Sequence, residues 1–167
     1  LTALPLFVEY FKKKNIPNLT VVAPDTGRAE YAKRLSDQLK ADLVLLHKTR
    51  PNHNVAEITN VVGDVNQRNL LIIDDMIDTA GSITSSVSTL KKLGCHDIYV
   101  AATHAVFSGP AVERLSQAGF KEVVVTDTIA IPTAKKFDQL TVLSIAPMLA
   151  EAINRNYHNK SISSLFL

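Results

Sequence analysis

The stretch that says most about the fold is residues 70–82, Leu-Leu-Ile-Ile-Asp-Asp-Met-Ile-Asp-Thr-Ala-Gly-Ser. Its first four residues form a continuous apolar run, which predicts a strand buried on both faces over Leu70–Ile73. The residues that follow, Ser82–Leu93, place Val87 and Leu90 at helical spacing. A buried strand that leads into a helix is typical of a parallel α/β sheet, in which ligands bind at the carboxyl ends of the strands. We therefore expect the polar residues 74–82 to lie at a ligand-binding edge.

The same alternation of apolar runs and helical patterns extends over the rest of the chain. It predicts an α/β fold of three layers (α/β/α) around a central, mostly parallel sheet. Gly94 and Gly119 each stand where a helix C-cap is expected. A further run, Leu140–Ile145, either extends the sheet or covers it. The other expected strands are Leu19–Ala23, Leu43–His47, Ile98–Thr103 and Val123–Thr126, and the other expected helices are Arg28–Lys40, Pro110–Ala118 and Met148 to about Asn156.

One segment has no regular pattern of its own. Residues Lys48–Asn54 follow a buried strand and predict an exposed, mobile loop. Beyond it, Val55–Asn60 alternates and Val61–Val65 reads as a short strand, so that the loop forms the tip of a flap. No linker interrupts the pattern, and we expect a single domain over residues 1–167.

Composition excludes several classes of protein. The net charge is only +2 and aromatic residues are 6%, which argues against nucleic acid as a partner. The sole cysteine, Cys95, excludes an intramolecular disulfide and a thiolate metal cluster, and fits a reducing cytoplasm. No apolar run approaches the length of a membrane span, so we expect no membrane association through one. The chain begins at Leu1 in mid-pattern, and we expect it to be a piece of a longer protein.

The end of the decisive stretch has the composition of an anion-binding turn. Gly81 permits a tight turn, and backbone N–H groups from about Thr79 to Ser82 at the start of a helix favour a phosphate group. The hydroxyl groups of Thr79 and Ser82 add donors. A phosphate monoester is therefore the expected guest.

The carboxylates before this turn suit the other end of the same ligand. Asp74 and Asp75 can accept hydrogen bonds from vicinal hydroxyl groups. Phosphate at one end and a diol at the other describe a ribose 5-phosphate. The alternative is that Asp74 and Asp75 form a solvated strand end and that Asp78 caps the helix.

This stretch resembles the phosphoribosyl-diphosphate-binding motif of the phosphoribosyltransferase fold, which type I phosphoribosyltransferases and ribose-phosphate diphosphokinases share. Further segments are similar to the diphosphokinase family in particular. They are the pyrophosphate loop (Val21–Arg28, with Asp25, Thr26, Gly27 and Arg28), the flexible catalytic loop (Lys48–Pro51), the segment Thr103–Ala111 and the ending Ser161–Phe166.

The resemblance implies transfer of the diphosphoryl group of MgATP to the 1-hydroxyl of ribose 5-phosphate, giving phosphoribosyl diphosphate and AMP. It implies that Lys48 and Arg50 stabilise charge in catalysis and that Asp25 ligates Mg²⁺; a solvated basic loop and a simple turn aspartate are the alternatives. The substrate-binding residues that it implies are Arg50, Asp74, Asp75, Asp78, Thr79, Ala80, Gly81 and Ser82.

The resemblance covers only the second half of the family's polypeptide. It implies a missing amino-terminal domain that supplies much of the ATP site, so that this piece alone binds ribose 5-phosphate without turnover. It also implies a homo-oligomer, a hexamer in the family, with Ser161 and Ser163 near a regulatory site. Arg28 stands where many members have Gly. The alternatives are a type I phosphoribosyltransferase and a non-catalytic regulatory subunit that binds phosphoribosyl diphosphate.

Overall fold

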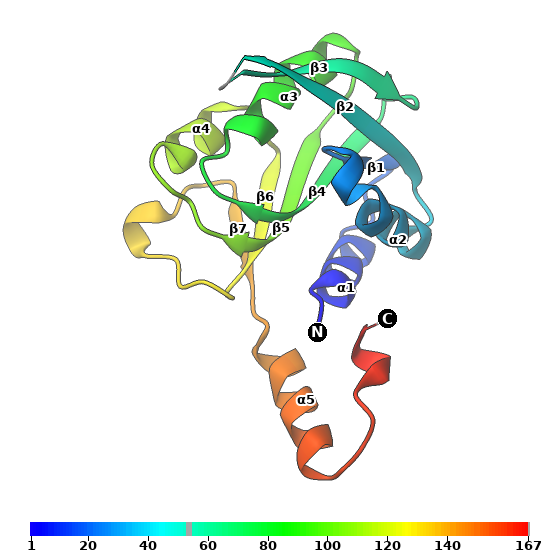
Figure 1. Ribbon diagram of the computed structural model, residues 1–167, viewed down its shortest axis with the longest axis vertical. Coiled ribbons are helices and arrows are strands. Elements are labelled where there is room, and N and C mark those ends of the chain that lie inside the picture. Colours follow the sequence, from blue (N-terminus) through cyan, green and yellow to red (C-terminus); the bar gives the residue numbers. More distant parts are fainter. Residues whose placement is uncertain (53–54, 167) are drawn as a thin grey trace.

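Strand β4 (Asn69–Ile77), which contains the predicted apolar run, lies at the centre of the sheet (Figure 1). The structure is a computed structural model that describes residues 1–52 and 55–166, with side chains outside residues 48–59. The described residues form a seven-stranded sheet in the order β3-β2-β1-β4-β5-β6-β7. The other strands are β1 (Leu19–Ala23), β2 (Asp42–Asn52), β3 (Val55–Val62), β5 (Ile98–Ala105), β6 (Glu122–Thr126) and β7 (Leu140–Leu143).

Helices cover both faces of this sheet. Leu70 and Ile72 of β4 pack into one core with α3 (Gly81–Lys92) and α4 (Ala111–Gln117). Leu71 and Ile73 point to the opposite face and pack into a second core with α1 (Leu4–Lys14) and α2 (Ala29–Leu39). Because successive residues of a strand point to opposite faces, a strand that is buried on both must be apolar throughout. The predicted three-layer α/β/α architecture is confirmed.

All neighbouring strands in the sheet pair in parallel except β2 and β3, which pair antiparallel. β1 and β4 lie side by side although residues 24–68 come between them in the sequence. The reason is that β2 and β3, which these residues contain, lie on the other side of β1. The segments that follow β1 and β4 therefore meet at one edge of the sheet. Such a point, where the strand order reverses, is where parallel sheets bind ligands.

Strand β4 extends further than the sequence predicts. β4 continues past Ile73 to Ile77, because its backbone keeps pairing with β5 through Asp74↔Ala102 and Met76↔His104. Asp74 and Asp75 therefore lie within the strand and not after it.

The predicted loop over Lys48–Asn54 is wrong for residues 48–52. These residues belong to β2, which pairs with β3 through Lys48↔Ile58 and Thr49↔Glu57. Backbone pairing with β3 keeps this segment in a strand, and such pairing cannot be predicted from the polar residues of the segment itself. The hairpin agrees with the predicted flap, while residues 53–54 at its tip lie outside the described residues.

The carboxyl-terminal segment departs from the three layers. β7 extends the sheet, which settles the alternative for Leu140–Ile145, and α5 (Ala146–Tyr157) then projects away from the sheet (Figure 1). Every residue of α5 is at least partly exposed, with Ile153 at 69% and Tyr157 at 82%. The chain returns through a short 3-10 turn, η3 (Ser163–Phe166), where the carbonyl oxygen of Phe166 accepts a hydrogen bond of 3.0 Å from Arg34 Nη2.

Among the described residues, the helices are all too short or too polar to cross a membrane.

Candidate ribose-phosphate site

The two acidic residues of β4 share one arginine from the neighbouring loop. Arg28 ends η1 (Thr26–Arg28), the 3-10 turn that follows β1. Its Nε donates to Asp74 Oδ1 at 3.0 Å, and its Nη2 donates to Asp75 Oδ2. The backbone N–H of Asp75 also donates to Asp74 Oδ1, at 2.8 Å. The guanidinium therefore bridges both carboxylates at the edge where β1 and β4 end.

Burial and like charge shape the chemistry of this pair. The side chain of Asp74 is 19% exposed, and loss of hydration raises its pKa to about 6. The hydrogen bond from the Asp75 N–H opposes this shift, the neighbouring Asp75 carboxyl reinforces it, and the charge of Arg28 opposes it. The two carboxylates are thus hydrogen-bond acceptors, and their surroundings stabilise the negative charge of Asp74 less well than water does.

The turn that the sequence predicts to bind an anion begins directly after β4, with Asp78 and Thr79 exposed. Ala80, with φ +61°, takes a left-handed conformation, and Gly81, where the sequence predicted a tight turn, is the first residue of α3. Glycine suits position 81 for another reason: an added Cβ there would lie 3.2 Å from Arg114 Nη1. The turn places the first turn of α3, whose backbone N–H groups favour an anion, next to the acidic end of β4.

Two neighbouring segments hold this turn in place. Arg114 of α4 donates from Nη1 to the carbonyl oxygen of Thr79 at 3.0 Å. The backbone N–H groups of Phe107 and Ser108 donate to the carbonyl oxygens of Ile77 and Asp78, each at 3.0 Å. The segment Thr103–Ala111, singled out in the sequence, therefore supports the shape of the turn through its backbone.

The loop after β1 carries the predicted metal ligand. Asp25 is exposed, and its Oδ1 accepts a hydrogen bond of 3.2 Å from the backbone N–H of Arg28. In the part of the chain that the structure describes, no group of three or more His, Cys, Asp or Glu side chains could hold a metal ion. Mg²⁺ often binds through one or two carboxylates, with substrate phosphates and waters completing its shell. Asp25 fits that mode of binding.

The chain is similar in sequence to a known protein family. The model of the phosphoribosyl synthetase-associated domain matches residues 50–167. The chain belongs to this family.

Relatives and solved structures agree with the assignment. The chain is 45% identical to a ribose-phosphate pyrophosphokinase of Bacillus caldolyticus, over 99% of this chain and 53% of that protein. It is 48% identical to the ribose-phosphate pyrophosphokinase of Synechococcus elongatus, over 97% of this chain and 50% of that protein. This chain thus spans about half the length of the curated relatives it matches.

The structural likeness is close to one solved relative and extends to the wider fold. The phosphoribosylpyrophosphate synthetase of Mycobacterium smegmatis superposes with a TM-score of 0.85 at 42% identity, over 94% of this chain and 51% of that one. A purine phosphoribosyltransferase of Pyrococcus horikoshii, at 17% identity and a TM-score of 0.53, shows the shared fold alone. The predicted phosphoribosyltransferase-like fold is confirmed.

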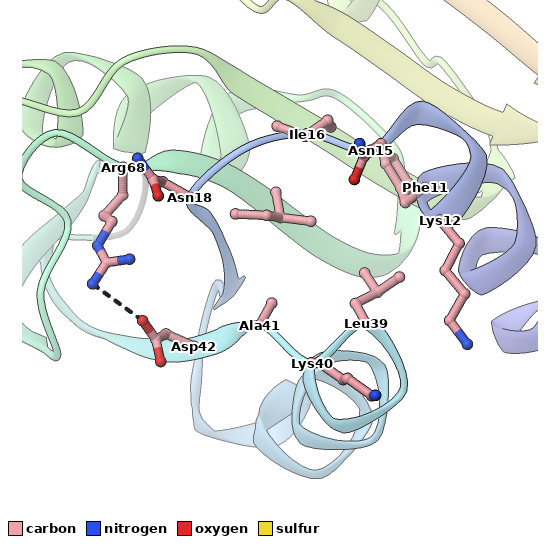
Figure 2. A pocket seen from close by; sticks show the side chains of 11 residues that line it. Phe11, Lys12, Asn15, Ile16, Asn18, Leu39, Lys40, Ala41, Asp42 and Arg68 are labelled. Carbon is pink, nitrogen blue, oxygen red and sulfur yellow. Dashed lines mark ion pairs between the residues drawn. The ribbon is translucent and has the colours of Figure 1, made fainter.

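Two cavities lie at opposite ends of the sheet of this phosphoribosyl synthetase-associated domain. A cavity of about 400 Å³ adjoins the acidic edge, and Arg28, Asp75, His104 and Met148 are among the residues that line it. The other, of about 340 Å³, opens at the amino ends of β1, β2 and β4, where Arg68 pairs with Asp42 at 3.2 Å (Figure 2). α1 and α2 both end at this second cavity, so the negative ends of two helix dipoles point to it, while Lys12, Lys40 and Arg68 are among the residues that line it.

Not every predicted site residue is brought to the acidic edge. Asp25, Arg28 and the residues of the 74–82 motif come together at the ends of β1 and β4. Ser161 and Ser163 lie beyond α5, where Ser161 Oγ donates to Ser163 Oγ at 3.1 Å. Lys48 and Arg50 are residues of β2, and the structure describes their backbone but not their side chains.

Sequence reasoning missed two contacts of this domain's site. The pairing of Arg28 with Asp74 and Asp75 joins residues 46 and 47 positions apart, and Arg114 reaches Thr79 across 35 positions. Neither contact follows from a local spacing. The strand order, which brings the end of β1 beside β4, is the information that reveals the first of them.

Proposed function

We propose that this domain binds ribose 5-phosphate for transfer of the diphosphoryl group of MgATP to its 1-hydroxyl, giving phosphoribosyl diphosphate and AMP. The observation that carries the proposal is the single unit β4–turn–α3, which joins paired carboxylate acceptors to an anion-binding helix start. The diol of a ribose suits the first and its phosphate suits the second. The names of the relatives support the same substrate.

Each residue then has a defined task in the proposed reaction. Asp74 and Asp75 accept hydrogen bonds from the ribose hydroxyl groups, while Thr79, Ala80, Gly81 and Ser82 hold the 5-phosphate and Asp78 shapes the turn. The 1-oxygen attacks the β-phosphorus of ATP, the bond from that phosphorus to the α–β bridging oxygen breaks, AMP leaves, and the hydroxyl proton passes to solvent.

Charge neutralisation supplies most of the catalysis in such a transfer. Lys48 and Arg50 of the β2–β3 hairpin are proposed to stabilise the charge that develops on the phosphates, and Arg50 also to contact substrate. Asp25 is proposed to hold Mg²⁺, which when bound neutralises the phosphates. The loop Asp25–Arg28 faces the diphosphate.

The complete enzyme is proposed to need more than these 167 residues. In this proposal an amino-terminal domain supplies much of the ATP site, and the protein works as a cytoplasmic homo-oligomer whose regulation involves Ser161 and Ser163. Because binding of the nucleotide orients the triphosphate, the domain alone should bind ribose 5-phosphate and release no AMP.

Calorimetric titration of the domain with ribose 5-phosphate tests the binding. Asp74→Asn and Asp78→Asn should each weaken binding, while Asp37→Asn, which removes an exposed carboxylate on α2, should not. Circular dichroism establishes that each variant is folded. Unchanged affinity in both site variants would reject the assignment of the acidic motif.

A second assay follows the products with MgATP and ribose 5-phosphate present. AMP release from the domain alone would show that the ATP site lies within these residues and would overturn the need for a further domain. Pyrophosphate release from phosphoribosyl diphosphate and a nucleobase would instead identify a phosphoribosyltransferase.

A further inference from the structure

Arg28 occupies an unusual position for an exposed loop residue. Its guanidinium, on a side chain that is 35% exposed, donates to one oxygen of Asp74 and one oxygen of Asp75. These two acceptors are consecutive in β4, whereas the donor arrives from the turn after β1. A planar fork that spans two carboxylates is a geometry that arginine forms and lysine does not.

We propose that Arg28 is the resident counter-ion of the Asp74–Asp75 pair, taking the place that a divalent cation would otherwise take and leaving the pair open to the hydroxyl groups of a ligand. The part of this inference that concerns hydroxyl groups rests on the proposed function. The part that concerns the cation does not.

The positive charge of Arg28 offsets part of the negative charge of the Asp74–Asp75 pair. Two adjacent carboxylates repel each other and repel a phosphorylated ligand, whereas the guanidinium reduces their combined charge from −2 to −1. Oxygens of ionised carboxylates accept more than one hydrogen bond each, so a single guanidinium does not exhaust the acceptor capacity of two carboxylates. A neutral diol can therefore bind beside Arg28.

Arg28 and a divalent cation compete for the same carboxylate oxygens. Mg²⁺ and Mn²⁺ prefer carboxylate oxygens, and two such groups side by side are an attractive partial site for them. A guanidinium carries only donors and cannot share a metal, so Arg28 and a divalent cation exclude each other at the same oxygens. A metal that arrives with phosphates is thereby directed away from the pair and toward Asp25, whose carboxylate meets only a backbone N–H of Arg28 among the contacts seen for it.

The test uses Mn²⁺ alone as a probe, at pH 7.5, with affinity measured from water-proton relaxation. Arg28→Ala should bind Mn²⁺ roughly tenfold more tightly than the unaltered domain. Asp75→Asn added to Arg28→Ala should abolish the gain, and Arg28→Lys, which keeps the charge but not the planar fork, should recover only part of the exclusion. Arg34→Ala, which removes an exposed arginine of α2, is the matched control and should leave Mn²⁺ binding unchanged.

Ribose 5-phosphate titrated without a divalent cation provides the second measurement. Arg28→Ala should weaken its binding roughly tenfold, and Mn²⁺ should restore part of the loss. Tighter binding by Arg28→Ala would mean that Arg28 blocks the pair, and unchanged Mn²⁺ affinity would mean that it excludes no cation; either result overturns the inference.

The two proposals can fail separately. If the unaltered domain does not bind ribose 5-phosphate, the proposed function fails, while the Mn²⁺ series still decides the role of Arg28. Thermal unfolding of each variant checks the fold, and Arg28→Gln, a shorter side chain that loses the charge but keeps hydrogen-bond donors, replaces Arg28→Ala if the latter does not fold.

Discussion

Asp74 is held at a cost to the fold that its proposed role explains. Burial raises its pKa to about 6, above the ordinary value of 3.8, so the folded protein resists carrying this charge. A group of this kind destabilises the fold when ionised, because the unfolded chain solvates the charge fully. Residues that serve a ligand commonly carry such a cost.

Asp74→Asn should therefore raise stability while it weakens ribose 5-phosphate binding. Because the folded pKa is raised, the gain should be full above about pH 6, shrink as the pH falls from 6 towards 3.8, and vanish below that. Urea unfolding at a series of pH values measures it. A difference between the two proteins that stays constant across this range would contradict the assignment.

Ala80 offers a second prediction at the scale of one residue. It is buried with φ +61°, a conformation in which a branched side chain is strained. Ala80→Gly should keep both the melting temperature and ligand binding close to those of the unaltered domain. Ala80→Val should cost about 1–3 kcal/mol and weaken phosphate binding. If calorimetry finds that both variants bind equally well, the backbone of this turn does not set the phosphate site.

Single residues also show where sequence reasoning stops. The types and order of residues 74–82 predicted acceptors followed by an anion-binding turn; the structure shows carboxylates at the end of β4, followed by a turn into α3, and the binding roles stay a prediction. The sequence predicted that Gly81 permits a tight turn, yet Ala80 is the residue that adopts the left-handed conformation, and Gly81 makes room for Arg114. Choosing between adjacent positions requires the neighbours that only the fold supplies.

At the scale of elements, α1 is anchored to the edge of the sheet by a polar cluster around Glu122. This residue is 8% exposed; its Oε1 accepts from Tyr10 Oη at 2.5 Å and from Thr141 Oγ1 at 2.7 Å, and its Oε2 lies 2.6 Å from Lys14 Nζ. Lys14, at the end of α1, is therefore part of this cluster. The cluster links α1, β6 and β7, which are elements far apart in the sequence.

Glu122→Gln should destabilise the domain by roughly 1–3 kcal/mol at neutral pH, the range for hydrogen bonds to a charged group. Burial alone would raise the pKa of Glu122, but the hydrogen bonds from Lys14, Tyr10 and Thr141 outweigh it and lower the pKa below 4.5. Its contribution is thus full above pH 4.5 and is lost as the pH falls below it.

Unfolding of the Glu122→Gln variant between pH 3 and 8 provides the measurement. Glu9→Gln, which breaks an exposed pair with Lys13 on the same helix, is the control and should have little effect. An equal loss in both variants would show that the cluster does not anchor α1.

Elements differ in how well the sequence predicts them. β1 was predicted with its observed bounds, because a run of five apolar or β-branched residues between polar turns leaves little choice. β2 was predicted to end near His47, five residues too early. Its outer half pairs with β3, beyond the residues of β2 that pair with β1, and pairing between strands leaves no periodic signal in a polar segment.

For the whole molecule, α5 and the residues after it stand apart from both cores. Removal of residues 146–167 should leave a domain that unfolds cooperatively, with a melting temperature lower by no more than about 2–4 °C. The reason is that α5 has no residue buried within it, and the return segment adds few contacts to α1.

Thermal unfolding followed by circular dichroism tests this prediction. Removal of residues 159–167 alone, which keeps α5, separates the effect of the helix from that of η3. A broad or non-cooperative transition in the longer deletion would show that α5 belongs to the folding unit.

The position of β4 has a consequence for the exchange of backbone amide protons with solvent. Its inner residues are buried and paired on both sides, so their amides should exchange only when the whole domain opens, whereas those of α5 exchange through local fraying. The same strand carries Asp74 and Asp75, the proposed acceptors for the ligand. Ligand at a hundredfold excess over its dissociation constant should therefore slow exchange in β4 about a hundredfold and leave α5 unchanged. Protection of the most deeply buried amides in the molecule then becomes a measure of how fully its exposed edge is occupied.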